Sequence, residues 1–89
     1  QMNYDVLLHP KADDFLQKVD DKIETRIKEK MKSLSSDPNK GKKLKYSDFW
    51  RLRIGEYKAI YEIDNKDEKI VILFIGNRKD VYDDFSRLV

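Results

Sequence analysis

An alternation of apolar and cationic side chains over residues 50–61, broken by a Gly-Glu pair, leaves few folds open to this chain. Alternation with period two is typical of a β-strand that has one buried face and one exposed face. The pair Gly55-Glu56 suits a two-residue hairpin loop, whose first central residue can need a positive φ. This stretch therefore predicts a β-hairpin with one apolar face and one cationic face.

The position of the turn determines which residues face each other. With the loop at this place, Ile54 pairs with Tyr57 and Arg53 pairs with Lys58. Arg51 then lies on the same face as these two cations. The other face holds the apolar residues, which are Trp50, Leu52, Ile54, Tyr57, Ala59 and Tyr61. Like charges opposite each other on a sheet destabilise it by up to ~1 kcal/mol. We therefore expect the three cations to bind an anion.

The charge is uneven along the chain. The formal net charge is only +2, but seven of the Lys and Arg residues and only two acids fall within residues 39–58. This favours a local anion site over the broadly basic surface of a general nucleic-acid coat protein. Because the chain has no Cys, it has no disulfide framework and no thiolate metal site, which is compatible with a reducing cytoplasm. The longest apolar run is far shorter than the ~18 residues of a membrane span, so we expect a soluble protein.

The remaining patterns predict a single α+β domain in the order β-α-α-β-β-β-α. A strand is expected over residues 3–9, and helices over residues 10–19 and 23–34, which form an αα-hairpin. Residues 69–75 form a strand that is apolar on both faces, so this strand should be central in the sheet. Residues 82–88 have helical spacing. We expect a four-stranded, mainly antiparallel sheet with the αα-hairpin on one face and a short C-terminal helix.

Two sequence blocks, Trp50–Ile63 and Ile75–Tyr82, resemble the RelE family of toxin–antitoxin ribonucleases, within the RelE/ParE superfamily. The size and the order of elements agree with that family. The resemblance covers essentially the whole chain, so residues 1–89 should form one RelE-like toxin domain. It implies a cytoplasmic type II toxin that enters the ribosomal A site, cleaves messenger RNA there and inhibits translation. It also implies a RelB-like antitoxin that holds the toxin inactive.

The resemblance further implies a catalytic set. The basic positions of the family hairpin fall on Arg51, Arg53 and Lys58, and the arginine and tyrosine beyond the last strand fall on Arg78 and Tyr82. Guanidinium groups match phosphate oxygens and can stabilise charge on the transition state, but they stay protonated and are poor bases. Either Lys58 or Tyr82 would therefore assist the 2′-hydroxyl. Tyr82 could also stack on a base, and Arg78 would face the leaving oxygen.

Two positions depart from the family pattern. Asn77 stands where relatives often have His, and Arg53 stands where some relatives have Lys. The second departure puts a lysine-type base at that position in doubt. His9, which precedes a proline, is interpreted as a cap or surface residue. The acidic residues form no ligand cluster, so we expect no metal and no other cofactor.

Residues 38–47 look like a solvated loop, with an alternative role as an arm that binds ribosomal RNA through phosphates. The lysines concerned are Lys40, Lys42, Lys43 and Lys45. Two other functions stay open for the whole chain. One is a ParE-like toxin that acts on DNA gyrase and needs no phosphate-cleaving cluster. The other is a non-catalytic RNA-binding or ribosome-binding module, for which the cationic face is only a docking surface.

Overall fold

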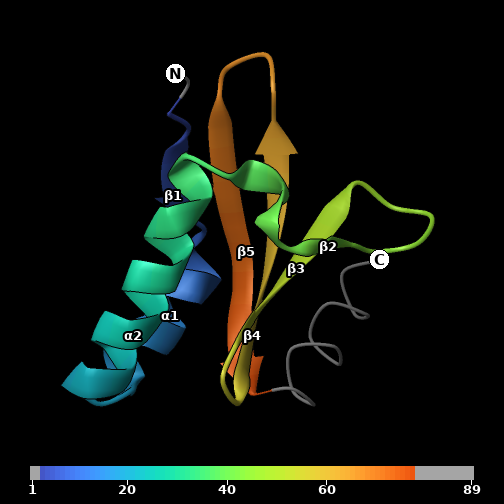
Figure 1. Ribbon diagram of the computed structural model, residues 1–89. Coiled ribbons are helices and arrows are strands. Elements are labelled where there is room, and N and C mark those ends of the chain that lie inside the picture. Colours follow the sequence, from blue (N-terminus) through green and yellow to red (C-terminus); the bar gives the residue numbers. More distant parts are fainter. Residues whose placement is uncertain (1–2, 78–89) are drawn as a thin grey trace.

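Five strands form one mixed sheet, and two helices pack against one of its faces, in a computed structural model that describes residues 3–77 (Figure 1). The strands are β1 (Asp5–Leu8), β2 (Lys42–Lys43), β3 (Phe49–Ile54), β4 (Tyr57–Asp64) and β5 (Lys69–Asn77). The helices are α1 (Pro10–Lys18) and α2 (Asp21–Lys32), followed by the short 3-10 turns η1 (Ser33–Ser35) and η2 (Pro38–Lys40). Among the described residues, no helix is long and apolar enough to cross a membrane.

The sheet order is β1-β5-β4-β3-β2, in which β1 pairs with β5 in parallel and the other neighbours are antiparallel. The α+β class is confirmed, and β5 is an interior strand between β1 and β4, although the strand at the centre of the order is β4. The expected count of four strands is wrong, because β2 adds a fifth strand to the sheet at Lys42 and Lys43. A strand of two exposed lysines carries no apolar alternation that could reveal it. The expected C-terminal helix lies outside the described residues.

Helix α1 begins at Pro10 as expected, and α2 begins at Asp21, two residues before the expected residue 23. The ring Nδ1 of His9 accepts a hydrogen bond of 3.2 Å from the Lys11 amide, and this caps α1. The Asp20 carboxylate accepts one of 3.0 Å from the Ile23 amide, and this caps α2. The interpretation of His9 as a capping residue is therefore confirmed.

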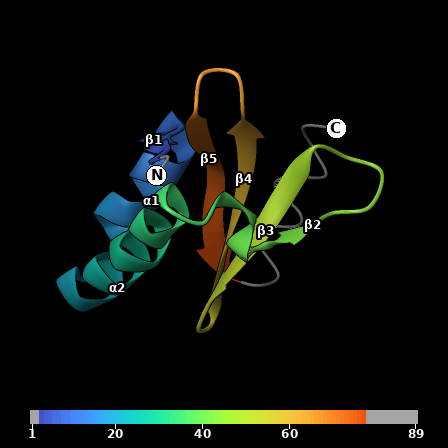
Figure 2. The same ribbon diagram turned by 45° about the horizontal axis from the view of Figure 1, so that its top comes forward.

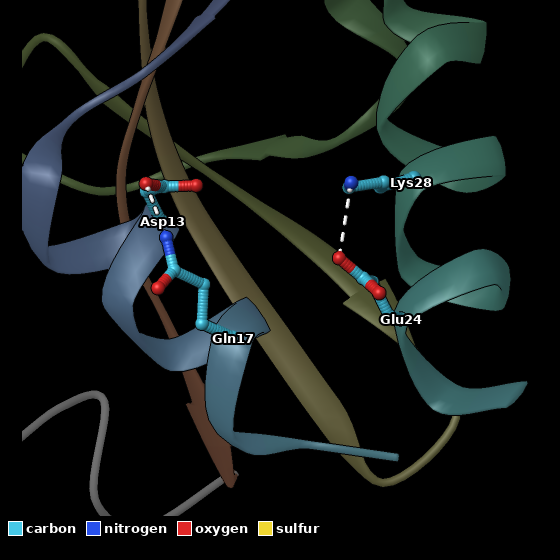
Figure 3. A network of polar contacts seen from close by, with 4 residues as sticks. All are labelled: Asp13, Gln17, Glu24 and Lys28. Atoms are coloured by element: carbon cyan, nitrogen blue, oxygen red, sulfur yellow. Dashed lines mark hydrogen bonds and ion pairs between the residues drawn. The ribbon is translucent and has the colours of Figure 1, made fainter. Parts of the chain in front are cut away.

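Polar pairs one turn apart support the exposed sides of the helices (Figure 3). The Gln17 amide donates to Asp13 on α1 at 3.0 Å, and Lys28 pairs with Glu24 on α2 at 3.0 Å. Such pairs stabilise a helix by only ~0.2–0.5 kcal/mol each. Most of the stability of α1 and α2 must therefore come from their buried faces.

The main core lies between the helices and the sheet. The apolar stripes of α1 and α2 pack against the side chains of β3, β4 and β5 on one face. Its members from the helices are Ala12, Leu16, Ile27 and Met31, and those from these three strands are Leu52, Ile54, Ala59, Tyr61, Ile70, Ile72 and Ile75. A second, smaller cluster contains Ile60 and Phe74 with Leu44, Phe49 and Leu73 around them.

An irregularity in the pairing of β4 with β5 distributes the apolar residues of β5 between the two faces of the sheet. Ile60 pairs with Phe74, but the next residue, Tyr61, pairs with Ile72, so that Leu73 is an extra residue in β5. A bulge of this kind changes which side chains face each side of the sheet. Ile72 therefore belongs to the main core, while Phe74 belongs to the second cluster.

Candidate functional site

The hairpin of β3 and β4 has the predicted register. Gly55 adopts a φ of 59°, a left-handed conformation that favours glycine, at the first position of the turn. As a result Ile54 pairs with Tyr57, and Arg53 lies directly opposite Lys58. The expectation that the turn would bring two cations together is confirmed.

The two faces of this hairpin also differ as expected. Leu52 and Ile54 are buried in the main core, so the alternating residues Arg51 and Arg53 point to the opposite side of the sheet. Lys58 lies on that side too, since Ala59 and Tyr61 face the core. The structure therefore brings Arg51, Arg53 and Lys58 together on one face, which we call the cationic face.

The three cations differ in exposure. Arg53 is exposed and Arg51 is half-buried, but only 5% of Lys58 is accessible to solvent. On its other side Lys58 pairs with Gly76 of β5, which has no side chain. A buried lysine is unusual in a sheet face that only serves solubility. The alternation placed Lys58 on the polar face of the hairpin and did not reveal this burial.

The structure does not describe the other two residues of the predicted catalytic set. Arg78 and Tyr82 lie outside the described residues, and so does any contact they make. Asn77 is the last residue of β5 and pairs with Tyr57 beside the hairpin turn. This places Asn77 across β4 from Ile54, at the same end of the sheet as Arg53.

The four lysines of residues 38–47 lie in different local structures. Lys42 and Lys43 form β2, where Lys42 pairs with Arg51 and Lys43 pairs with Trp50, so their assignment to a loop is wrong. Lys40 ends η2, and its Nζ donates a hydrogen bond of 3.1 Å to the Ser33 hydroxyl. Lys45 lies in an irregular segment between β2 and β3.

A buried tyrosine holds this lysine-bearing segment in place. The Tyr61 hydroxyl donates to the Pro38 carbonyl at 2.8 Å and accepts from the Gly41 amide at 3.0 Å. Its ring stacks on Trp50 with 6.2 Å between centroids. Burial raises the pKa of Tyr61, the hydrogen bond from Gly41 opposes this shift, and the charge of Asp37 adds to it. Sequence reasoning placed Tyr61 in the core but gave no sign of its hydrogen bonds.

Gly41 is the partner of Tyr61 in one of these hydrogen bonds. A Cβ at Gly41 would lie only 2.7 Å from the Tyr61 hydroxyl and would also overlap the Arg51 carbonyl. Only glycine lets the chain pass this close to β3, and β2 begins at the next residue. Figure 2 shows the green segment that leaves α2 crossing from the helices to β2 at the edge of the sheet.

A cleft of about 430 Å³ lies at another part of the molecule, where β3 begins and β4 ends, away from the hairpin turn. Its walls include the acids Asp48, Glu62 and Asp64 beside one lysine, Lys43. This excess of carboxylates suits an anionic ligand poorly. The cationic face, and not this cleft, is therefore the candidate site for a phosphate.

Comparison with protein families gives a match over most of the chain. The profile of the ParE toxin of the type II toxin–antitoxin system parDE matches residues 6–82. This range includes the hairpin and four of the five strands completely, and it reaches the predicted Arg78 and Tyr82. No curated protein matches the sequence at a significant level.

Solved structures give further matches. The toxin–antitoxin complex RelBE2 from Mycobacterium tuberculosis is similar with 27% identity and a TM-score of 0.77, over 88% of this chain and 94% of that chain. The archaeal RelE–RelB complex from Pyrococcus horikoshii is similar with 28% identity and a TM-score of 0.72, over 88% and 98% of the two chains. A free mutant of the E. coli toxin RelE shares the fold, with 18% identity and a TM-score of 0.79 over 99% and 100%.

Proposed function

The chain belongs to the RelE/ParE superfamily of type II toxin–antitoxin toxins, and we propose that it is a ribosome-dependent endoribonuclease that cleaves messenger RNA in the A site. The observation that carries this proposal is the position of Arg53 directly opposite Lys58, with Arg51 on the same face. A pair of like charges in this position costs up to ~1 kcal/mol of stability. A bound RNA phosphate would offset that cost.

The proposed reaction uses the RNA's own 2′-hydroxyl as the nucleophile. The 2′-oxygen attacks the adjacent phosphorus, its proton passes to a base, the bond from phosphorus to the 5′-oxygen breaks, and that oxygen takes up a proton. The products are a 2′,3′-cyclic phosphate and a free 5′-hydroxyl. Arg51 and Arg53 would stabilise the additional negative charge on the phosphorane, so the scheme requires no metal ion.

The remaining residues of the predicted catalytic set would carry out the proton transfers. Lys58 is buried beside Arg53, where water is largely excluded and electrostatic interactions are stronger than in bulk solvent. Either Lys58 or Tyr82 would accept the 2′-proton, and Arg78 would face the scissile phosphate and the leaving oxygen. A base and a charged donor within hydrogen-bond reach of the reacting atoms typically contribute 10²–10⁴-fold.

A cognate antitoxin is the proposed regulatory partner. The relatives from Mycobacterium tuberculosis and Pyrococcus horikoshii were solved as complexes of a toxin with its antitoxin. We extend this to the present chain and propose a RelB-like antitoxin that keeps the toxin inactive in the cytoplasm. Ribosomes and messenger RNA would be reached only after the antitoxin is removed.

The experiment is a cleavage assay with a defined messenger RNA, in which ribosomes are programmed with a codon in the A site or are left out. We expect cleavage at the A-site codon with ribosomes and little cleavage without them. An intact messenger under both conditions, together with normal folding of the protein, would overturn the proposal. Tight, salt-dependent binding without cleavage would instead support a non-catalytic RNA-binding module.

Inhibition of DNA gyrase is the second candidate function, because the matching family profile is that of a ParE toxin. A gyrase inhibitor would need no cluster for phosphate cleavage, so it gives the pairing of Arg53 with Lys58 no role in catalysis. The two functions differ in cells. Blocked translation with cleaved messenger supports the ribonuclease, whereas blocked replication with trapped gyrase supports the gyrase inhibitor.

A further inference from the structure

A cleft separates α2 from the outer edge of β3. Strand β2 pairs only with Trp50 and Arg51, so no described strand covers the edge of β3 from Leu52 to Ile54. Two adjoining hollows of about 400 and 300 Å³ lie along this edge. They share Lys30, Lys40 and Arg53 as lining residues, so we treat them as one feature, the edge cleft.

The walls of the edge cleft are strongly cationic. The cations that line it are Arg26 and Lys30 of α2, Lys40 of η2, Lys42 of β2, and Arg51 and Arg53 of β3. Among the described residues that line it, Glu29 is the one acid. Fields of several like charges in a hollow add together and raise the local concentration of anions. The edge cleft therefore favours a ligand with several negative charges.

Local contacts hold one of these cations, Lys40, in position. The Ser33 hydroxyl accepts from Lys40 Nζ at 3.1 Å, and Tyr61 fixes the backbone on both sides of Lys40 through Pro38 and Gly41. Arg26 extends from α2 to the hairpin turn, since its Nη1 lies 3.5 Å from the place where a Cβ of Gly55 would be. The loss of side-chain freedom on binding is smaller for groups that are already positioned.

The edge cleft is continuous with the cationic face, because Arg51 and Arg53 belong to both. We propose that the edge cleft binds the sugar–phosphate backbone of RNA next to the scissile phosphate, as an extension of the substrate site. This inference rests on the proposed function and adds a path for the substrate strand. Lys30 and Arg26 of α2, which no motif indicated, become substrate-binding residues.

An acidic peptide that adds a strand to the edge of β3 is the other occupant to consider. Such a strand gains specificity from pockets for its alternate side chains. Here the apolar residues at the open edge, Leu52 and Ile54, are each only 3% exposed and already belong to the main core. They offer little surface to an apolar side chain of a peptide. Charged walls without apolar pockets suit a phosphodiester backbone better.

The test measures binding of a single-stranded RNA oligonucleotide by fluorescence anisotropy at several salt concentrations. Each phosphate contact that is lost should reduce the steepness of log K against log[salt] by about 0.7 for a single strand. We expect a reduction of this size for Lys30→Gln and for Lys40→Gln. The matched control is Lys22→Gln, an exposed lysine of the same helix that does not line the edge cleft. A slope in the two variants equal to that of the control would overturn the inference.

Two further measurements make the result specific. A synthetic polyglutamate peptide is used as a second probe. If Lys30→Gln and Lys40→Gln bind this peptide more weakly than the control does but bind RNA equally well, the edge cleft is a peptide site and the inference is overturned. In the ribosome assay, Lys30→Gln should raise KM more than it lowers kcat, because Lys30 lies away from the reacting atoms. If the wild-type protein does not cleave programmed messenger, the proposed function fails, and the RNA slopes still decide whether the edge cleft binds RNA.

Discussion

The Tyr61 hydroxyl accepts a hydrogen bond of 3.0 Å from the Gly41 amide, twenty residues earlier in the chain. The same hydroxyl donates to the Pro38 carbonyl, so one side chain of β4 satisfies two backbone groups of the segment between α2 and β2. The segment carries Lys40 and leads into Lys42. A fully buried residue of the main core therefore determines where cations of the edge cleft lie.

Removal of this hydroxyl should destabilise the protein and loosen the cleft. We expect Tyr61→Phe to lower the free energy of unfolding by about 1–3 kcal/mol, because it leaves two backbone groups without their partner. Urea unfolding measures this change. Tyr46→Phe is the matched control, since Tyr46 is fully exposed. A Tyr61→Phe protein as stable as the control would show that water replaces the hydroxyl at no cost.

The raised pKa of Tyr61 predicts a loss of stability in alkaline solution. Burial is the main cause of the shift above the ordinary value of 10.0, so the folded state holds the phenolic proton more tightly than the unfolded state. This contribution to stability is complete below pH 10.0 and is lost as the pH rises towards the raised pKa. The difference in unfolding free energy between wild type and Tyr61→Phe should therefore shrink above about pH 10. A difference that stays constant up to pH 11 would contradict the assignment.

Gly41 and Gly55 should respond to substitution for different reasons. In Gly41→Ala the added Cβ would overlap the Arg51 carbonyl and the Tyr61 hydroxyl. Either β2 separates from β3 to relieve this overlap, or the overlap remains and lowers the stability by about 1–3 kcal/mol. In Gly55→Ala the space is sufficient, and the cost is the positive φ of 59°, about 1 kcal/mol. Thermal unfolding compares the two. RNA binding should weaken for Gly41→Ala only, since that change displaces Lys42.

The hairpin could be predicted because its information is local. The alternation and the glycine at the turn specify the pairing of Arg53 with Lys58 without reference to the rest of the chain. By contrast, β2 depends on the approach of Gly41 to β3, and the placement of Lys30 beside Arg53 depends on how α2 packs. Contacts between segments distant in the sequence leave no periodic pattern. The sequence therefore predicted the cationic face but not the cleft that continues it.

The identity of the general base follows from a pair of variants. Lys58→Met keeps a long side chain in the buried position but removes the amine, and Tyr82→Phe removes only a hydroxyl. The variant that lacks the base should lose about 10²–10⁴-fold in the single-turnover rate on programmed ribosomes, while the other should lose much less. Equal losses below tenfold in both variants would remove both residues from proton transfer. The comparison requires that circular dichroism shows both variants to be folded to the same extent.

Arg53 should show a conflict between stability and activity. Its exposed guanidinium lies opposite Lys58, so Arg53→Ala removes a like-charge pair and should leave the stability unchanged or raise it by up to ~1 kcal/mol. The same change should slow messenger cleavage by at least about 100-fold, because a group that stabilises the transition-state charge is lost. Arg53→Lys, which keeps the charge but not the planar fork, should retain part of the rate. A variant Arg53→Ala that is both less stable and fully active would mean that the cationic face has a structural role, and would count against its use on a phosphate.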